Sequence, residues 1–153
     1  MTGRIPIPEA EQPDADGDRY RLEEQVGFLL RKAMQRHTAI FAEEMPLGLT
    51  PTQFAALSKL EEIGPCSQNR LGRIAAMDVA TIKGVVDRLK ARRLVVTTLD
   101  PTDRRRRLID LTTAGHEAVI EAQRAGTTIT ERTLETLSPR ERVALLRLLA
   151  KIS

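Results

Sequence analysis

Apolar residues recur at helical spacing along most of the chain, and one central stretch follows a different pattern. From Tyr20 to about Met45, apolar side chains return every three or four residues, as they do on one face of an amphipathic helix. Comparable spacing predicts further helices at 51–63, from Ser67, at 79–90, from about Thr113 to Leu134 and at 139–152. The central stretch contains two short runs typical of strands, Leu94–Leu99 and Leu108–Thr112, joined by turn residues at 100–103. The pattern predicts a mainly helical α+β fold with one hairpin.

The helix that follows Asp78 has one apolar face and one polar face. Asp78 is a favoured N-cap residue, and we expect the apolar stripe after it to enter the core: Ile82, Val85, Val86 and Leu89. The opposite face carries small, hydrogen-bonding and cationic residues: Ala80, Thr81, Lys83, Gly84, Asp87 and Lys90. Side chains of these kinds can meet base edges or phosphates.

Two earlier helices lead into this one. Thr50 and Gln53 have the spacing of a capping box, and Pro51 suits a first helical turn. The short helix from Ser67 and the helix from Asp78 together predict a helix-turn-helix, in which the first member braces the second. We expect the first member to offer four side chains to a DNA backbone: Gln68, Asn69, Arg70 and Arg73.

Positive charge is concentrated in the centre of the chain. Between residues 66 and 107 there are eleven Lys and Arg residues against four Asp, a net charge of +7, whereas the whole chain is +3 and the remainder is therefore −4. Four adjacent arginines, Arg104–Arg107, lie between the predicted strands and repel one another unless an anion separates them. A solvated Arg-rich hairpin is the alternative, but the concentration of charge favours a polyanionic partner.

The stretch from Leu71 to Gly115 resembles the winged helix-turn-helix of the MarR family of bacterial transcriptional regulators. Val86-Asp87-Arg88-Leu89, followed by Leu94-Val95, resembles the end of that family's recognition helix and its first wing strand. Asp103-Arg104-Arg105, followed by Leu108, Leu111-Thr112 and Gly115, resembles its wing motif. The order of the predicted elements extends the resemblance to residues 20–152.

Two positions depart from the family pattern. Arg93 stands where the family often has a glycine that closes the recognition helix, so a non-glycine residue must adopt that turn. Lys83-Gly84 stands where Thr or Ser followed by Arg is common. These departures leave the predicted fold unchanged, but they leave the operator sequence open.

The resemblance implies a homodimeric regulator, a repressor by expectation, that binds pseudo-palindromic double-stranded DNA. Thr81, Lys83 and Gly84 are then expected nearest the bases, and Arg105 is expected to reach a minor groove with its guanidinium braced by Asp103. The complete set of predicted DNA-binding residues is Gln68, Asn69, Arg70, Arg73, Ala80, Thr81, Lys83, Gly84, Arg88, Asp103, Arg104, Arg105 and Arg106.

The resemblance also implies release by a small effector, which in this family is typically an aromatic or phenolic acid or its acyl thioester. The candidate ligand-binding residues are Arg36, His37, Phe41 and Phe54, because cationic groups can pair with a carboxylate and phenyl rings can cover an aromatic ring. His37 has a second interpretation. It falls on the apolar face of its helix, where a lone histidine is often a packed and hydrogen-bonded core residue.

The chain divides into four predicted segments. Residues 1–18 are rich in Pro and Gly and predict a flexible tail, although Ile5–Pro8 could lie against a partner subunit. Residues 19–48 and 113–153 are assigned to a helical dimerisation region, and residues 49–112 to the DNA-binding region. The last helix is too apolar for an isolated surface, so we expect its leucines to hold a two-fold interface: Leu145, Leu146, Leu148 and Leu149.

Composition narrows the alternatives. The chain has no apolar run of the ~20 residues that a membrane span requires and no secretory signal, so we expect a cytoplasmic protein. Cys66 is the single cysteine, and a small buried hydrophobe is favoured over a redox sensor. Two histidines and one cysteine make no ordinary zinc site, no phosphate loop or nucleophile elbow is present, and we therefore expect neither a cofactor nor catalysis. The rival function is a winged-helix adaptor that binds an acidic protein through its basic face.

Overall fold

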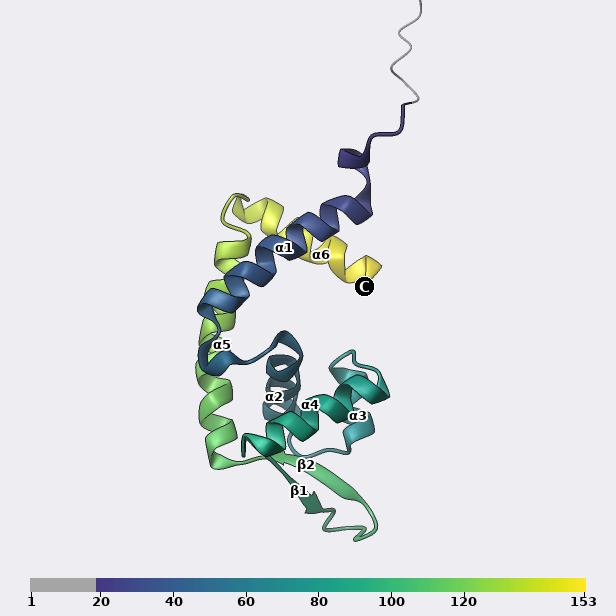
Figure 1. The fold of residues 1–153 in the computed structure, drawn as a ribbon, viewed down its shortest axis with the longest axis vertical. Helices are drawn as coiled ribbons and strands as arrows, with labels where there is room; N and C mark the ends of the chain where they lie inside the picture. Colours follow the sequence, from purple (N-terminus) through teal and green to yellow (C-terminus); the bar gives the residue numbers. More distant parts are fainter. Residues whose placement is uncertain (1–18) are drawn as a thin grey trace, which may run out of the picture. The chain divides into compact units, whose positions relative to one another are not determined.

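The computed structural model describes residues 19–153 of the chain, and these fall into two units, residues 19–34 and residues 35–153. The predicted tail at 1–18 lies outside the described residues. Figure 1 shows the elements, which follow one another in this order: the 3-10 turn η1 (Leu22–Glu24), α1 (Val26–Glu44), the 3-10 turn η2 (Pro46–Gly48), α2 (Pro51–Ile63), α3 (Gln68–Ile74), α4 (Val79–Ala91), β1 (Val95–Leu99), β2 (Arg107–Leu111), α5 (Thr113–Thr133) and α6 (Pro139–Ile152). The predicted mainly helical α+β fold is confirmed.

The predicted helix starts are confirmed by their caps. The side chain of Thr50 accepts from the backbone N–H of Gln53 at 3.2 Å, and Oε1 of Gln53 accepts from the N–H of Thr50 at 3.1 Å, which completes a capping box. Ser138 and Glu141 form a second capping box at the start of α6. Ser67 caps α3 in the same way, by accepting from the backbone N–H of Arg70. Each of these cap side chains satisfies one first-turn N–H group of its helix.

The first helix begins later than the sequence predicts. Apolar spacing predicted a helix from Tyr20, but α1 begins at Val26 after the separate turn η1. Gln25 is extended, with φ −81° and ψ 131°, and its side chain donates to the carbonyl oxygen of Arg21. A 3-10 turn repeats its side chains every three residues, so apolar spacing alone does not separate it from the helix that follows.

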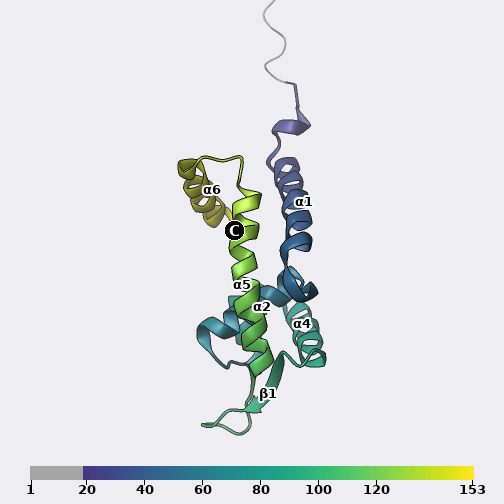
Figure 2. The same ribbon diagram turned by 90° about the vertical axis from the view of Figure 1, so that its left-hand side faces the viewer.

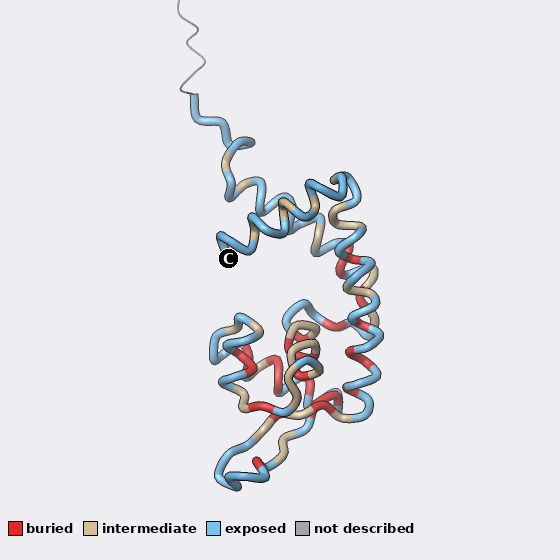
Figure 3. Tube along the Cα trace, turned by 180° about the vertical axis from the view of Figure 1, so that it is seen from behind, coloured by how far each residue is buried: buried red, intermediate tan, exposed pale blue. Residues whose placement is uncertain are grey.

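The core lies among α2, α3, α4, the hairpin and the middle of α5. Figure 3 shows buried chain concentrated in these elements. The largest fully buried side chains are Leu57, Leu60, Leu71, Ile82, Leu89, Val85, Val86 and Val119. Four of these form the stripe predicted on α4. The exposed face of that helix is thereby fixed, because its opposite face is packed.

The hairpin is an antiparallel pair with a short third segment beside it. Val95 pairs with Leu111 and Leu99 with Arg107, so each strand lies within one residue of its predicted bounds. Cys66 extends this sheet, because its N–H and carbonyl exchange hydrogen bonds with Ile109 at 3.1 and 2.8 Å. Its thiol is buried, and burial raises its pKa. The interpretation of Cys66 as a small buried hydrophobe is confirmed.

The end of α4 turns through a left-handed residue. Arg93 has φ 58°, its N–H donates to the carbonyl of Lys90, and the N–H of Leu94 donates to the carbonyl of Leu89. These two bonds are those of a Schellman motif, in which the left-handed position is usually glycine. The non-glycine turn expected at Arg93 is confirmed.

α5 approaches α2 closely through small residues. Ala118, Val119 and Ala122 are buried in α5, and Figure 2 shows α5 beside α2. A Cβ on Gly126 would lie 3.1 Å from Cζ of Phe54, tighter than ordinary contact. Gly126 is therefore placed where the ring of Phe54 leaves little room for a side chain.

α6 contains no buried residue in a single protomer, and Figure 3 shows it without buried chain. Its exposed apolar side chains are Val143, Leu146, Leu148 and Ile152, between 51% and 69% exposed, whereas Leu145 and Leu149 are half-buried. Among the helices that the structure describes, none is long and apolar enough to cross a membrane.

Candidate nucleic-acid interface

The polar face of α4 is open to solvent. The carboxylate of Asp78 accepts from the backbone N–H of Thr81 at 2.7 Å, and this hydrogen bond lowers the pKa of Asp78. Ala80, Thr81 and Lys83 are exposed, and Gly84 is half-buried. An ionised cap at one end and a buried stripe along one side thus hold the helix with its predicted DNA-facing residues outward.

Lys83 and Arg88 on this helix have different neighbours. Nζ of Lys83 is 2.9 Å from Oδ2 of Asp87, one turn further on, and both side chains are more than half exposed. Such surface pairs are weak, so Lys83 remains available to an anion. The guanidinium of Arg88 lies over Gly84, where a Cβ would be 3.5 Å from Nη1.

α3 packs against α4 and carries the four predicted backbone contacts. Asn69, Arg70 and Arg73 are exposed, and Gln68 is half-buried. Gly72 faces Ile82, since a Cβ there would lie 3.0 Å from Cγ2 of that residue. The close approach of the two helices at this glycine sets how α3 braces α4.

The wing is shaped by the two aspartates of its turn. Asp100 is 8% exposed and accepts from the hydroxyl and the N–H of Thr102 at 2.7 and 2.8 Å; Nη1 of Arg106 lies 3.7 Å from it. The hydrogen bonds from Thr102, and then the charge of Arg106, lower the pKa of the Asp100 carboxyl. Asp100 therefore organises the turn from inside as an anion.

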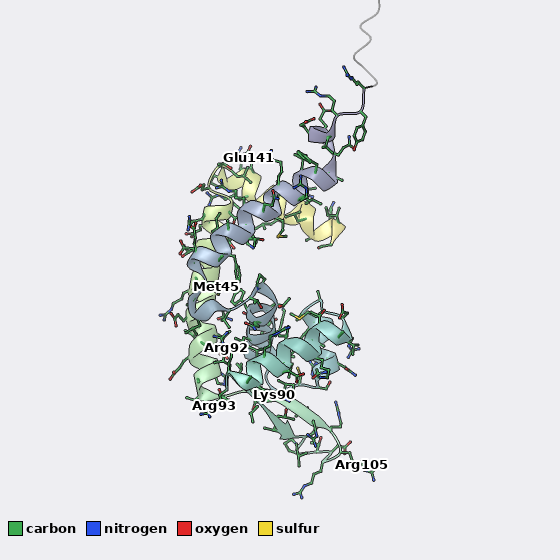
Figure 4. The ribbon with its side chains drawn as sticks, in the orientation of Figure 1. Met45, Lys90, Arg92, Arg93, Arg105 and Glu141 are labelled. Atoms are coloured by element: carbon green, nitrogen blue, oxygen red, sulfur yellow. The ribbon has the colours of Figure 1, made fainter. Side chains whose placement is uncertain are left out.

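Asp103 was predicted to hold the guanidinium of Arg105, and this prediction is wrong because the carboxylate binds the backbone of Arg105. Oδ1 of Asp103 accepts from the backbone N–H of Arg105 at 3.0 Å, in an Asx-type turn. The aspartate thus fixes the backbone of Arg105, which leaves the guanidinium extended from the tip of the wing, as Figure 4 shows. Arg104 and Arg106 are also exposed.

The wing is joined to α5 by the residues of the motif Leu-Thr-x-x-Gly. The hydroxyl of Thr112 donates to the carbonyl of Arg93 at 2.7 Å and accepts from the N–H of Gly115 at 3.0 Å. The N–H of Thr112 donates to the carbonyl of Leu94 at 3.1 Å. The motif therefore locks the start of α5 onto the end of α4.

The predicted ligand residues are brought together in part. Ring centroids of His37 and Phe41 are 6.2 Å apart, and those of Phe41 and Phe54 are 6.3 Å apart. Phe41 is 7% exposed, and Nδ1 of His37 lies 3.0 Å from the hydroxyl of Thr133. His37 is thus half-buried and hydrogen-bonded, as the core interpretation expects, and it also belongs to an aromatic cluster, defined here as His37, Phe41 and Phe54.

The guanidinium of Arg36 binds acceptors outside the aromatic cluster. Its Nη2 lies 2.7 Å from Oε1 of Glu135 and 3.1 Å from the carbonyl oxygen of Arg132. Arg132 in turn pairs with Glu43 and Glu44, which raise its pKa, Glu44 having the larger effect. None of these partners was predictable, because charged residues so far apart in the chain carry no spacing signal.

A three-helix unit with an exposed polar helix, an arginine-rich hairpin beside it and a net charge of +7 at 66–107 defines a winged helix-turn-helix DNA-binding protein. Comparison with known proteins identifies the family. A model of the MarR family matches residues 47–106. The HTH-type transcriptional repressor NicR of Pseudomonas putida is 46% identical over 141 residues, which cover 90% of this chain and 87% of NicR.

Solved structures agree with this assignment. A probable transcriptional regulator from Pseudomonas aeruginosa is 49% identical with a TM-score of 0.83, over 87% of this chain and 100% of that one. BpsR of Bordetella bronchiseptica, whose DNA binding is regulated by 6-hydroxynicotinic acid, is 44% identical with a TM-score of 0.82, over 88% of this chain and 97% of BpsR. The chain belongs to the MarR family, and it is a DNA-binding transcriptional regulator rather than an enzyme.

Proposed function

We propose that the protein is a homodimeric repressor that binds a pseudo-palindromic operator and is released from it by a small aromatic acid. The observation that carries the proposal is the pairing of an exposed, cationic DNA-binding unit with an apolar helix, α6, that has no buried residue in one protomer. The first feature provides the half-site contact, and the second provides a surface for a second copy.

The DNA contacts are proposed for two elements. Thr81, Lys83 and Gly84 of α4 enter the major groove, and Arg105 reaches a minor groove from the tip of the wing. The exposure of these residues supports this assignment, with Gly84 half-buried beneath Arg88. The arginines among the remaining predicted contacts neutralise phosphates and set the orientation of the protein on the duplex: Arg70, Arg73, Arg88, Arg104 and Arg106.

Dimerisation is proposed for the regions 19–48 and 113–153. The exposed apolar side chains of α6 are grouped on one helix, unlike the isolated apolar residues of an ordinary protein surface. A two-fold partner would cover them. Residues 19–34 add further exposed apolar side chains, namely Tyr20, Leu22, Val26, Leu29, Leu30 and Met34. A two-fold dimer would place two copies of α4 about one helical turn of DNA apart, ~34–36 Å.

A hydroxylated pyridine carboxylic acid is the effector class that the relatives favour. BpsR responds to 6-hydroxynicotinic acid, and the protein NicR is a repressor of similar sequence. The aromatic cluster supports the proposal, since Phe41 and Phe54 offer ring faces and His37 offers a polar ring nitrogen beside them. Arg36 lies one residue from His37 and would have to exchange Glu135 for the effector's carboxylate.

The effector proposal is tested by thermal denaturation of the full chain with 6-hydroxynicotinic acid and with a panel of aromatic acids. A binder at 100 times its Kd stabilises the protein by about 2.7 kcal/mol. We expect 6-hydroxynicotinic acid to raise the Tm of the wild type and to have much less effect on His37→Ala. Absence of any shift across the panel would contradict the effector class, and an equal shift for His37→Ala would contradict the proposed location.

A further inference from the structure

One arginine of the basic segment, residues 66–107, is held by acceptors from another part of the chain. Nη2 of Arg92 donates to the carbonyl oxygen of Leu47 at 2.6 Å, and Nη1 donates to Oε1 of Gln53 at 3.4 Å. Other paired cations at 66–107 have partners inside that segment: Lys83 with Asp87, and Arg106 with Asp100. Within residues 19–153, Arg92 is the cation of this segment whose guanidinium reaches beyond it.

One acceptor, Leu47, lies in the connection between α1 and α2, and the other, Gln53, lies in the first turn of α2. Leu47 has φ 60° and is followed by Gly48 with φ 58°, so two successive left-handed residues shape this turn. Gln53 is 5% exposed, and its Oε1 also accepts the N–H of Thr50 in the capping box of α2. The contact of Arg92 is therefore made to a turn that is already well defined and to a buried amide.

Arg92 itself is the C-cap of α4. Figure 4 shows it at the end of α4 together with Lys90 and Arg93, on the side toward the chain near Met45. The next carbonyls, those of Arg93 and Leu94, accept from Thr112. The end of the DNA-binding helix is thus anchored on two sides: its carbonyls bind Thr112, the N-cap of α5, and the side chain of Arg92 binds Leu47 and Gln53.

We propose that Arg92 is a positioning residue for DNA recognition, which holds α4 against the α1–α2 connection and does not contact a phosphate. A guanidinium with two protein acceptors has a fixed direction, and a charge-assisted hydrogen bond is stronger than a neutral one. Base contacts depend on the position of α4 more sharply than phosphate contacts do. Loss of these hydrogen bonds therefore weakens binding to the preferred sequence more than it weakens binding to arbitrary DNA.

The salt dependence of DNA binding distinguishes an arginine that contacts a phosphate from one that positions α4. Each phosphate contact that is lost lowers the slope of log K against log salt by about 0.9 on B-DNA, and a positioning residue leaves the slope unchanged. The variants are Arg92→Met, which removes the charge, and Arg92→Lys, which keeps the charge but not the forked geometry. Arg70→Met is the comparison, since Arg70 is an exposed predicted phosphate contact with the same change in charge.

The experiment measures affinity by fluorescence anisotropy over a range of salt, for two duplexes. One is the duplex that the wild type selects from a random pool, and the other is a shuffled sequence. We expect both Arg92 variants to lose about tenfold in affinity for the selected duplex, as for loss of a charge-assisted hydrogen bond, with the wild-type slope and shuffled-duplex affinity retained. Retained binding to the shuffled duplex also shows that the variant is folded.

Two results would overturn the inference. The first is a slope that falls for Arg92→Met as it does for Arg70→Met while Arg92→Lys binds like the wild type, which is the behaviour of a phosphate contact. The second is wild-type affinity for the selected duplex in both Arg92 variants, which would mean that the hydrogen bonds of Arg92 do not position α4. Neither result depends on the effector, so the inference and the effector proposal fail separately.

Discussion

Gly115 packs directly on the backbone of Leu94, because a Cβ on Gly115 would lie 2.0 Å from the carbonyl oxygen of that residue. This is the close approach that the glycine of the wing motif permits. The oxygen cannot move freely, since it accepts from the N–H of Thr112. The glycine therefore allows α5 to start against the end of α4.

The first prediction is that Gly115→Ala destabilises the protein by about 3 kcal/mol, through overpacking against backbone. Chemical denaturation measures this change. Gly84→Ala is the matched control in a helix, because a Cβ there meets only the guanidinium of Arg88 at ordinary distance. We expect Gly84→Ala to stabilise by roughly 0.5–1 kcal/mol, and a similar loss in both variants would contradict the packing argument.

The second prediction concerns the tip of the wing. Arg105→Ala should weaken binding to the selected duplex and lower the salt slope, because its guanidinium is extended while its backbone is held by Asp103. The variant should keep the wild-type Tm. Gel-shift titrations at two salt concentrations measure the effect, and unchanged affinity would exclude Arg105 from the DNA contacts.

The third prediction is a loosening of the wing in acid. The pKa of Asp100 is lowered in the folded chain, so its contribution to wing stability is present above the pKa of an unfolded Asp, about 3.9, and is lost as the pH falls through the lower folded value. Amide hydrogen exchange at Thr102 should therefore lose protection at a pH below about 4. Asp100→Asn should show weak protection already at neutral pH; full protection in that variant would contradict the role of the carboxylate.

Much of the fold was predictable because its signals are local. Caps at Thr50, Ser67, Asp78 and Ser138 each follow from a residue type and a three-residue offset, and the buried stripe of α4 follows from helical spacing. The break at Gln25 was missed, because apolar spacing continues across it.

The parts of the site that were missed depend on contacts between distant residues. Nothing near Arg92 in the sequence indicates that it reaches Leu47 and Gln53, and its surroundings resemble those of any cation in a basic run. The same is true of Arg36 and Glu135. Residue type and spacing identified the exposed DNA-binding face, but the partners of individual arginines depend on how the helices pack.

The fourth prediction is that Leu146→Glu together with Leu149→Glu yields a monomer that no longer binds the full operator. A leucine that a partner covers contributes roughly 1.5–3 kcal/mol, and each substitution occurs twice in a two-fold dimer. Light scattering at micromolar concentration measures the mass, and circular dichroism checks that the helices persist. A dimer in the variant would mean that another surface holds the two copies together.

The proposed function requires that one small aromatic acid releases a dimer from its operator. Its most direct test is an anisotropy titration of the selected duplex, saturated with the wild-type chain, against 6-hydroxynicotinic acid. We expect a stoichiometry of two chains per duplex and a fall in anisotropy to that of free DNA over the concentration range in which the acid raises the Tm. Unchanged anisotropy throughout that range would contradict release by the acid, and saturation at one chain per duplex would contradict binding as a dimer.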